Sequence, residues 1–255
     1  MSGDTSERAK KVAVISGGMG YVGSEVVRKL ALDGFSVALL YHKSKKSTVL
    51  EAVSKLSGSG HKSYQCDLEN HKQVEKTIEK IEKELGNIYV CVHTAGTLPE
   101  RKQLHLSSVS DLRKQFETNI FGSFNFLSTC ATRLKEHKSG VMIGITTAGV
   151  ISGVNTKARG GYSVTKFALQ GMLTALKEEL SPYSVRVYSV APGVMSGGMN
   201  SGTPQAFIDI VKEKSPTKTL ANAKDVSETI SFLCSQKSRA ITNLTLLVAP
   251  ESGTL

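Results

Sequence analysis

Short apolar runs alternate along the chain with longer segments in which hydrophobic residues recur every three or four positions. The apolar runs have the character of buried strands and lie near residues 12–16, 36–41, 62–66, 88–93, 140–146, 185–190 and 244–248. Helical spacing is found near residues 22–33, 47–57, 70–85, 107–136, 161–180, 204–214 and 224–235. Strands that alternate with helices form a parallel sheet covered on both faces. The pattern predicts an α/β fold, a Rossmann-like doubly wound parallel sheet of about seven strands.

The first apolar run leads directly into a glycine-rich turn and then into a helical pattern. The turn consists of Gly17, Gly18, Met19, Gly20, Tyr21, Val22 and Gly23. Glycines permit a tight turn and close approach of the backbone, and the exposed amides at a helix start attract anionic oxygens. This order of elements predicts a pyrophosphate site. The alternative is a helix that merely begins after a glycine-rich turn.

The second strand ends in a basic segment rather than in a carboxylate. Tyr41 is followed by His42, Lys43 and Ser44. A site for NAD usually has Asp or Glu here, to bind the ribose hydroxyls of the adenosine. A hydroxyl and several amines instead suit the 2′-phosphate of NADP(H), which we therefore expect as the cofactor. The alternative is a lysine-rich helix start that faces solvent.

A tyrosine and a lysine stand four residues apart in the segment 161–180. On a helix, Tyr162 and Lys166 would share one face, and an ammonium beside a phenol makes the phenol a usable acid near neutral pH. The spacing alone is weak evidence for catalysis, because in a chain with 7 Tyr and 32 Lys plus Arg a basic residue follows some tyrosine at this distance by chance. A surface tyrosine beside a solvated lysine is the alternative. The glycine turn in the same chain favours the catalytic interpretation.

Length and composition indicate one domain. We expect residues 1–10 to be a polar, flexible N-terminus and residues 11–255 to form a single Rossmann-fold domain. There is neither the apolar stretch of a secretory signal nor the run of about 18 apolar residues that a membrane helix needs. These features predict a cytoplasmic protein. The four cysteines are widely spaced, so we expect buried thiols and no metal site.

The formal charge of +10 raises nucleic acid, an anionic membrane and an acidic small molecule as partners. The basic residues are scattered over many helices, and the chain has no tryptophan. We therefore expect neither nucleic acid nor a membrane as a partner. An anionic cofactor, together with a substrate that carries a carboxylate, a phosphate or a thioester-linked carrier, accounts for the charge more simply.

Several motifs in order make the chain similar to the short-chain dehydrogenase/reductase family, in its single-domain, 3-oxoacyl reductase-like branch. The resemblance runs from about Lys11 to the end of the chain. It rests on Ser16-Gly17 with Gly23, on Asp67-Leu68, on Thr94-Ala95-Gly96, on Asn119, on Tyr162 with Lys166, and on Pro192-Gly193.

The resemblance implies hydride transfer between NADPH and a ketone or secondary alcohol, for example a 3-oxoacyl thioester. Tyr162 would be the general acid/base, and Thr147 would replace the family's serine as hydrogen-bond donor to the substrate oxygen. Lys166 would hold the nicotinamide ribose and lower the pKa of Tyr162, and Asn119 would keep a water beside Lys166. Two of these residues have an alternative role that is only structural. Thr147 could be an inert residue at the end of a strand, and Asn119 could only cap or kink a helix.

Departures from the family pattern leave two other functions open. Tyr21 replaces the middle glycine, and the spacing of Gly17, Gly20 and Gly23 fits an extended branch of nucleotide-sugar epimerases and dehydratases. The segment after Pro192 is short for that branch. A catalytically weak dinucleotide-binding regulator is the third interpretation, since Thr147, Tyr21 and His93 all depart from the pattern. His93, which replaces an Asn, is expected to be a satisfied core histidine.

The substrate side of the site is expected to come from the later part of the chain. Residues 195–216 resemble the family's substrate lid, in which Ser196 is the nearest hydroxyl to the position of a usual Thr. Lys157 and Arg159 precede the Tyr162 helix and could receive an anionic group. By the family resemblance, the segments 107–136 and 161–180 would pack against another subunit, which predicts a homo-oligomer, a tetramer or dimer. The sequence does not identify the substrate.

Overall fold

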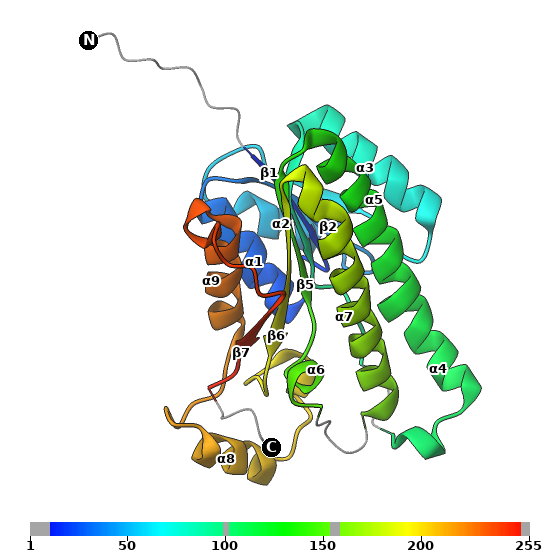
Figure 1. Cartoon of the computed structure of the whole chain (residues 1–255), viewed down its shortest axis with the longest axis vertical. Coiled ribbons are helices and arrows are strands. Elements are labelled where there is room, and N and C mark those ends of the chain that lie inside the picture. The colour runs from blue at the N-terminus through cyan, green and yellow to red at the C-terminus, as the bar shows by residue number, and fades with distance from the viewer. Residues whose placement is uncertain (1–10, 99–101, 154–158, 251–255) are drawn as a thin grey trace.

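The computed structural model describes residues 11–98, 102–153 and 159–250, and these residues build a seven-stranded parallel sheet (Figure 1). The strand order is β3-β2-β1-β4-β5-β6-β7. The predicted doubly wound sheet is thereby confirmed. The strands are β1 Val12–Ser16, β2 Ser36–Tyr41, β3 Lys62–Gln65, β4 Ile88–His93, β5 Gly140–Ile145, β6 Val185–Pro192 and β7 Thr245–Val248.

Helices cover both faces of the sheet. One face carries α1 (Tyr21–Leu32), α2 (Lys46–Ser54) and α9 (Ala223–Cys234), and the other carries α3 (His71–Leu85), α5 (Gly122–His137) and α7 (Gly160–Leu180). In Figure 1, α6 (Gly149–Ser152) and α8 (Gln205–Lys214) lie beyond the lower end of the sheet. Helix α4 (Val109–Phe116) comes before α5, and 3₁₀ turns occupy Leu104–Leu106, Ser181–Tyr183, Gly198–Asn200 and Gln236–Ser238.

The central strands β1, β2, β4 and β5 are largely apolar because both of their faces are buried, whereas the edge strands β3 and β7 are partly exposed. In β1, Val12 and Val14 pack toward α3, α5 and α7, whereas Ala13 and Ile15 pack toward α1 and α9. All four of these side chains are fully buried. Since successive strand residues point to opposite faces, a central parallel strand has no polar alternation.

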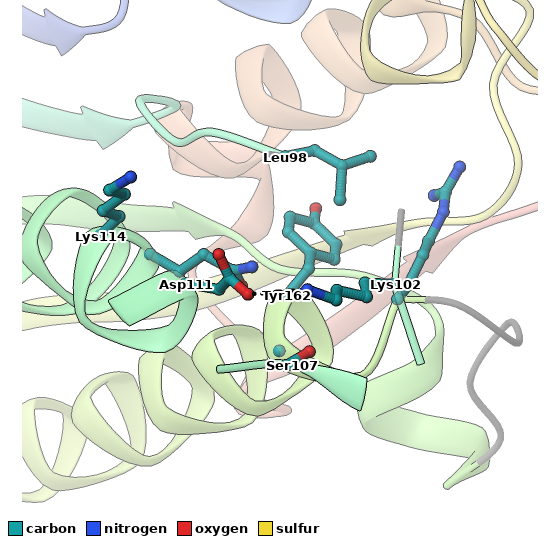
Figure 2. A pocket seen from close by; sticks show the side chains of 9 residues that line it. Leu98, Lys102, Ser107, Asp111, Lys114 and Tyr162 are labelled. Carbon is teal, nitrogen blue, oxygen red and sulfur yellow. Dashed lines mark hydrogen bonds and ion pairs between the residues drawn. The ribbon is translucent and has the colours of Figure 1, made fainter. Parts of the chain in front are cut away.

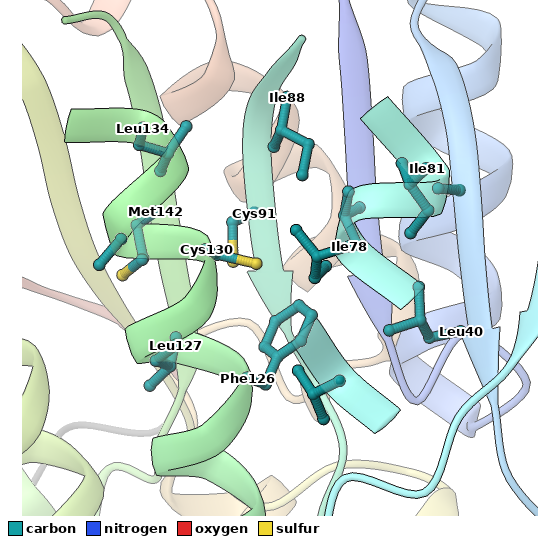
Figure 3. Close-up of a cluster of buried hydrophobic side chains, with 14 of the residues drawn as sticks. Leu40, Ile78, Ile81, Ile88, Cys91, Phe126, Leu127, Cys130, Leu134 and Met142 are labelled. Atoms are coloured by element: carbon teal, nitrogen blue, oxygen red, sulfur yellow. The ribbon is translucent and has the colours of Figure 1, made fainter. Parts of the chain in front are cut away.

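The four cysteines lie inside these cores. Cys91 of β4 and Cys130 of α5 face each other across the interior beside Phe126 (Figure 3), and Cys66 belongs to the same core. Cys234 lies in the core on the α9 side. All four are free, buried thiols, as predicted. Within the described ranges, no cluster of His, Cys, Asp or Glu could hold a metal ion, and no helix is long and apolar enough to cross a membrane.

The helix predicted over residues 107–136 is confirmed as an uninterrupted helical segment, but it contains a π-helical turn at Glu117–Phe121 between α4, which ends at Phe116, and α5, which begins at Gly122. Hydrophobic spacing did not indicate this turn, because it inserts one residue without interrupting the chain of helical backbone bonds. Helix α6 was also missed, being a single turn. The residues predicted as a flexible N-terminus lie outside the described ranges.

The strand order predicts a ligand-binding cleft between β1 and β4. The chain winds outward from β1 to β3 on one side and from β4 to β7 on the other, so the direction of winding reverses between β1 and β4. Loops that leave the carboxyl ends of these two strands turn to opposite faces of the sheet and leave a crevice. The predicted glycine turn follows β1 and therefore lies at this crevice.

Candidate active site

A cavity of about 680 Å³ opens at the carboxyl ends of the central strands. All of the predicted cofactor-binding and catalytic residues line it except Gly18 and Asn119. The structure thus brings together residues as far apart in the chain as Gly17 and Gly193. Their proximity follows from the parallel sheet, because every strand of such a sheet ends on the same side.

The loop after β1 leaves no space for a side chain at three of its glycines, Gly17, Gly18 and Gly23. Gly17 has a φ of 68°, and a Cβ atom on it would lie 2.8 Å from the backbone nitrogen of Ala95. A Cβ on Gly23 would collide with the carbonyl oxygen of Gly17. Gly18 instead faces the core, where a Cβ would lie 2.6 Å from Cγ of Leu39, which explains why it does not line the cavity.

The start of α1 suits a pyrophosphate. The residue before the helix is Gly20, which provides no side-chain cap, and the first helical residues Tyr21, Val22 and Gly23 line the cavity. A helix N-terminus attracts anionic oxygens through the amides of its first turn. The loop therefore fits the diphosphate of a dinucleotide.

Tyr21, which stands where the family has a glycine, leans on the segment after β6. A Cβ on Gly197 would lie 2.9 Å from Cε2 of the Tyr21 ring, and a Cβ on Gly198 would lie 2.9 Å from its Cδ1. The Tyr21 hydroxyl is 3.3 Å from Oγ of Ser196. The Tyr21 ring in the loop after β1 is thus accommodated by Gly197 and Gly198 in the segment after β6. Ser196 contacts Tyr21 rather than lining the cavity.

The edge of the cavity at the ends of β2 and β3 is basic and exposed. Lys43 and Ser44 line it at the end of β2, and Nε2 of His42 lies 3.7 Å from Oδ2 of Asp67. Asp67 comes from the end of β3 and accepts the backbone N–H of Glu69 at 3.1 Å. A hydroxyl and an ammonium beside this edge fit a phosphate on the adenosine ribose.

Tyr162 and Thr147 face the cavity from α7 and from the end of β5. The neighbouring Thr146 is buried, and its hydroxyl is bonded to Oγ of Ser189 at 2.7 Å, so Thr147 supplies the accessible hydroxyl. Burial raises the pKa of Tyr162 to about 12, and the guanidinium of Arg159 opposes this rise. Lys166 is not among the groups that shift the pKa of Tyr162 here, and the expectation that it lowers this pKa when the cofactor is bound stays a prediction.

Lys166 is directed to the backbone rather than to the phenol. Its Nζ donates a hydrogen bond to the carbonyl of Ile145 at 2.7 Å and lies 5.7 Å from the centre of the Tyr162 ring. Burial lowers the pKa of Lys166 to about 8. The amine also lines the cavity, where it is within reach of a ligand.

Asn119 lies in the π-helical turn and holds the loop after β4. Its Oδ1 accepts the backbone N–H of Thr97 at 2.7 Å, and its Nδ2 donates to the carbonyl of Thr97 at 2.8 Å. Nδ2 is also 3.2 Å from the hydroxyl of Thr165 on α7. These contacts tie three elements together behind the cavity. The water predicted at Asn119 stays a prediction.

His93 is a satisfied core histidine, as expected, and the sequence did not indicate its partners. Its Nδ1 is 2.8 Å from Oγ of Ser16, and its Nε2 is 2.7 Å from Oγ of Ser123. Because the Ser123 hydroxyl donates to the carbonyl of Asn119, it accepts from Nε2–H, and Ser16 donates to Nδ1. Burial and the charge of Lys166 lower the pKa of His93 to about 3, so the ring is neutral.

The predicted lid contributes residues that the sequence did not single out. Met195, Met199 and Asn200 line the cavity, and Nη2 of Arg159 donates to Oδ1 of Asn200 at 2.8 Å. No motif marks these side chains, since they come together only in three dimensions. Lys157, the other cation predicted near the substrate, lies outside the described residues.

Comparisons with known proteins agree with this geometry. Residues 19–249 match the model of a family described as "Enoyl-(Acyl carrier protein) reductase". A 3-oxoacyl-[acyl-carrier-protein] reductase FabG of Staphylococcus epidermidis is 25% identical over 240 residues, which are 93% of this chain and 97% of the relative. Tropinone reductase-like 3 of Erythroxylum coca is 32% identical over 252 residues, with 94% and 92% of the two chains covered.

Solved structures show the same fold. ElxO with NADP bound superposes with a TM-score of 0.82 at 23% identity, over 94% of this chain and 97% of that chain. A xylitol dehydrogenase bound to NAD⁺ has a TM-score of 0.84 at 19% identity, over 96% and 100%. The family match, the relatives and the fold agree, and the chain belongs to the short-chain dehydrogenase/reductase family, among its 3-oxoacyl reductase-like members.

Proposed function

We propose that the chain is an NADP(H)-dependent carbonyl reductase that interconverts a ketone and a secondary alcohol. The observation that carries the proposal is the single cavity shared by the glycine loop, Thr147, Tyr162 and Lys166. The oxidoreductases among the chain's relatives agree with a redox reaction of this kind. A 3-oxoacyl thioester is one candidate substrate, since FabG relatives are named for that reduction.

The bound nicotinamide would supply the hydride in reduction and accept it in oxidation. Tyr162, protonated at neutral pH, would donate its proton to the oxygen of the ketone as negative charge develops there. Thr147 would hydrogen-bond the same oxygen and fix its position. Both hydroxyls reach the cavity from rigid elements, which favours a defined geometry.

Lys166 would take part in the reaction by exchanging its hydrogen-bond partner when the cofactor binds. Its ammonium now donates to the Ile145 carbonyl, and the ribose hydroxyls of a bound cofactor would offer it acceptors within the same cavity. A cation moved toward Tyr162 would stabilise the phenolate that remains after proton transfer. Asn119, through Thr97 and Thr165, would keep the loop after β4 and the start of α7 in register.

NADP(H) rather than NAD(H) is supported by Lys43 and Ser44 at the adenosine end. A lysine there attracts a 2′-phosphate, and the described residues at the end of β2 include no carboxylate that would bind the 2′-hydroxyl of NAD(H). The NADP bound to ElxO is in keeping with this choice.

The proposal is tested by calorimetric titration with NADPH and NADH, followed by turnover assays on ketones, 3-oxoacyl thioesters and UDP-sugars. We expect tighter binding of NADPH, and NADPH oxidation with at least one ketone that disappears in Tyr162→Phe. Turnover of a UDP-sugar without net oxidation of the cofactor would instead favour an epimerase.

A catalytically weak cofactor-binding regulator is the second candidate. It is favoured by the departures of Tyr21, Thr147 and His93 from the family pattern, and by the Ile145 contact that directs the Lys166 amine to the backbone rather than to the phenol. Tight NADPH binding with no turnover, unaltered by Tyr162→Phe, would support the regulator and contradict the reductase.

We also propose a cytoplasmic homo-oligomer. Phe121 in the π turn and Phe124 of α5 are 51% and 54% exposed, and Val164 and Phe167 of α7 are 40% and 41% exposed. Exposed apolar side chains on neighbouring helices suit a subunit interface. Light scattering on the eluting protein should give a dimer or tetramer, and a monomer at working concentration would refute the interface.

A further inference from the structure

A series of hydrogen bonds runs behind the wall of the cavity, and His93 lies at its centre. The ring is 1% exposed, and its centre lies 5.5 Å from that of the Phe126 ring. Ser16, the last residue of β1, donates to Nδ1, and Nε2–H donates to Ser123 of α5. Both serines are buried. An Asn side chain has its polar atoms only at the level of Nδ1, so it would not reach Ser123 as well.

One end of this series supports the glycine loop. Ser16 directly precedes Gly17, and the carbonyl of Ser16 accepts the hydroxyl of Thr94 at 2.6 Å. Gly17 and Thr94 both line the cavity, and a Cβ on Gly17 would lie 3.0 Å from the same hydroxyl oxygen. Because the space here is so limited, a shift of Ser16 would displace the loop that we expect to hold the diphosphate. The 2.8 Å contact with His93 opposes such a shift.

The other end supports the π-helical turn before α5. The hydroxyl of Ser123 donates to the carbonyl of Asn119, inside that turn, at 2.6 Å. Nε2–H of His93 occupies the acceptor side of the same hydroxyl at 2.7 Å, so the ring determines the direction in which Ser123 donates. Turns of this kind are rare and frequently lie at functional sites.

Asn119 extends this support to two walls of the cavity. Its side chain exchanges hydrogen bonds of 2.7 and 2.8 Å with the backbone of Thr97, and its Nδ2 lies 3.2 Å from the hydroxyl of Thr165. Thr165 in turn donates to the carbonyl of Tyr162 at 2.7 Å. In Figure 2, the Tyr162 hydroxyl points toward Leu98, the residue after Thr97. The phenol and the loop opposite it are thus held by the same asparagine.

We propose that His93 is a positioning residue with two separable ends. Its Nδ1 contact positions the glycine loop for the cofactor, and its Nε2 contact positions the π turn and, through Asn119, the phenol of Tyr162. The ring itself is neutral and takes no part in the chemistry. The inference rests on the proposed reductase function. The departure of His93 from the family pattern then supports the site rather than weakening it.

Two substitutions separate the ends, because Asn and Gln place their amides differently. An Asn amide lies at the place of Nδ1, and a Gln amide lies at the place of Nε2. His93→Asn should therefore keep the contact with Ser16 and lose that with Ser123, whereas His93→Gln should do the reverse. Ser123→Ala and Ser16→Ala remove the same two contacts with a smaller change in volume, and they replace any His93 variant that does not fold.

Cofactor affinity measures the Ser16 end. In calorimetric titrations, His93→Gln and Ser16→Ala should bind NADPH about fivefold more weakly than the unaltered protein, as for the loss of one hydrogen bond. His93→Asn and Ser123→Ala should stay within about twofold of the unaltered protein, because they keep the Ser16 contact with the ring or with the loop unchanged.

The Ser123 end is measured both without and with turnover. The N–H of Thr97, which donates to Asn119, should exchange with deuterium about fivefold faster in His93→Asn and Ser123→Ala, as followed by NMR on the protein without cofactor. The kcat of ketone reduction should fall by about the same factor in these two variants. His93→Gln and Ser16→Ala should change neither quantity.

His61 provides the matched control. Its Nδ1 accepts the backbone N–H of Val37 at 3.2 Å, and its Nε2 lies 3.0 Å from the carbonyl of Ser57, so this ring is also bonded at both nitrogens. It lies before β3, at the opposite end of the sheet from the cavity. His61→Asn and His61→Gln should change neither NADPH affinity, nor exchange at Thr97, nor kcat.

The expected result is an opposite pattern in the two pairs of variants. Equal losses at both ends in His93→Asn and His93→Gln, or losses no larger than those of the His61 variants, would make His93 a structural residue only and overturn the proposal. The expected pattern in NADPH affinity and in exchange at Thr97, in a protein that reduces no ketone, would support the positioning role and contradict the reductase.

Discussion

The two ends of the cavity are built differently. One end, which we propose as the cofactor end, consists of the loops after β1, β2, β3 and β4, where backbone atoms and strand ends determine the shape. The other, which we propose as the substrate end, consists of the start of α7 and the segment from Met195 to Asn200, and side chains from distant parts of the chain determine its shape. The shape of the first end therefore depends on local backbone geometry, and that of the second depends on how distant segments pack together.

The largest effect is expected where the two ends meet. Tyr162→Phe removes the proton donor and should lower kcat about 10²–10⁴-fold, as for loss of a general acid. NADPH binding should change less than about twofold, because the phenol hydroxyl is not a phosphate contact. Steady-state kinetics and calorimetry on the same preparation measure both. A parallel loss of cofactor affinity would show that the two ends are not separable.

Two glycines give the sharpest steric contrast, one in the loop after β1 and one just beyond the substrate end. Gly17→Ala places a methyl group at φ 68° and 2.8 Å from Ala95, so we expect a loss of about 1–3 kcal/mol in the free energy of unfolding and strongly weakened NADPH binding. Gly202→Ala, at a position with no atom within 4 Å, should change neither. Thermal unfolding with and without NADPH measures the difference. Equal stability and equal NADPH binding of the two variants would contradict the steric role of Gly17.

Cofactor choice should depend on the basic edge of the cofactor end. Lys43→Gln should weaken NADPH about tenfold and leave NADH within about twofold, since only NADPH carries the 2′-phosphate. Lys76→Gln on α3 is the control for the loss of one positive charge. Equal weakening of both dinucleotides would show that Lys43 contacts some other part of the cofactor.

The pH dependence of kcat/KM should follow the protonation of the Lys166 amine. Because burial lowers the pKa of Lys166 to about 8, its ammonium predominates below pH 8 and is lost as the pH rises through that value. Reduction needs this cation beside the phenol, so kcat/KM should fall about tenfold for each pH unit above 8. His93, whose pKa is lowered to about 3, should cause no inflection near neutral pH. A flat profile from pH 7 to 10 would contradict the role of Lys166.

The smallest effect concerns the contact that joins the two loops. Tyr21→Gly removes the ring that leans on Gly197 and Gly198, and NADPH should then dissociate a few times faster in stopped-flow displacement. Tyr21→Phe keeps the ring and loses only the 3.3 Å contact to Ser196, so it should behave like the unaltered protein. Faster release from Tyr21→Phe alone would assign the effect to the hydroxyl instead.

The position of the glycine loop and of the basic segment at the cavity could be predicted from the sequence because their signals are local. The apolar run of β1, the glycines behind it and the lysine after β2 each carry a steric or electrostatic meaning within a few residues. The π turn at Asn119 and the pairing of Ser16, His93 and Ser123 could not be predicted, since they depend on contacts between distant segments. The same reason hid Asn200, which reaches the cavity only after α7 and the segment that follows β6 are packed together.

The central claim is that Tyr162, Thr147 and Lys166 surround the reactive ring of a bound nicotinamide. A crystal structure of the complex with NADPH tests it most directly. We predict a diphosphate at the start of α1, the Lys166 amine moved from the Ile145 carbonyl to the nicotinamide ribose, and the ring beside the Tyr162 hydroxyl. A fully occupied cofactor whose ring lies outside the cavity, or points away from that hydroxyl, would contradict the account.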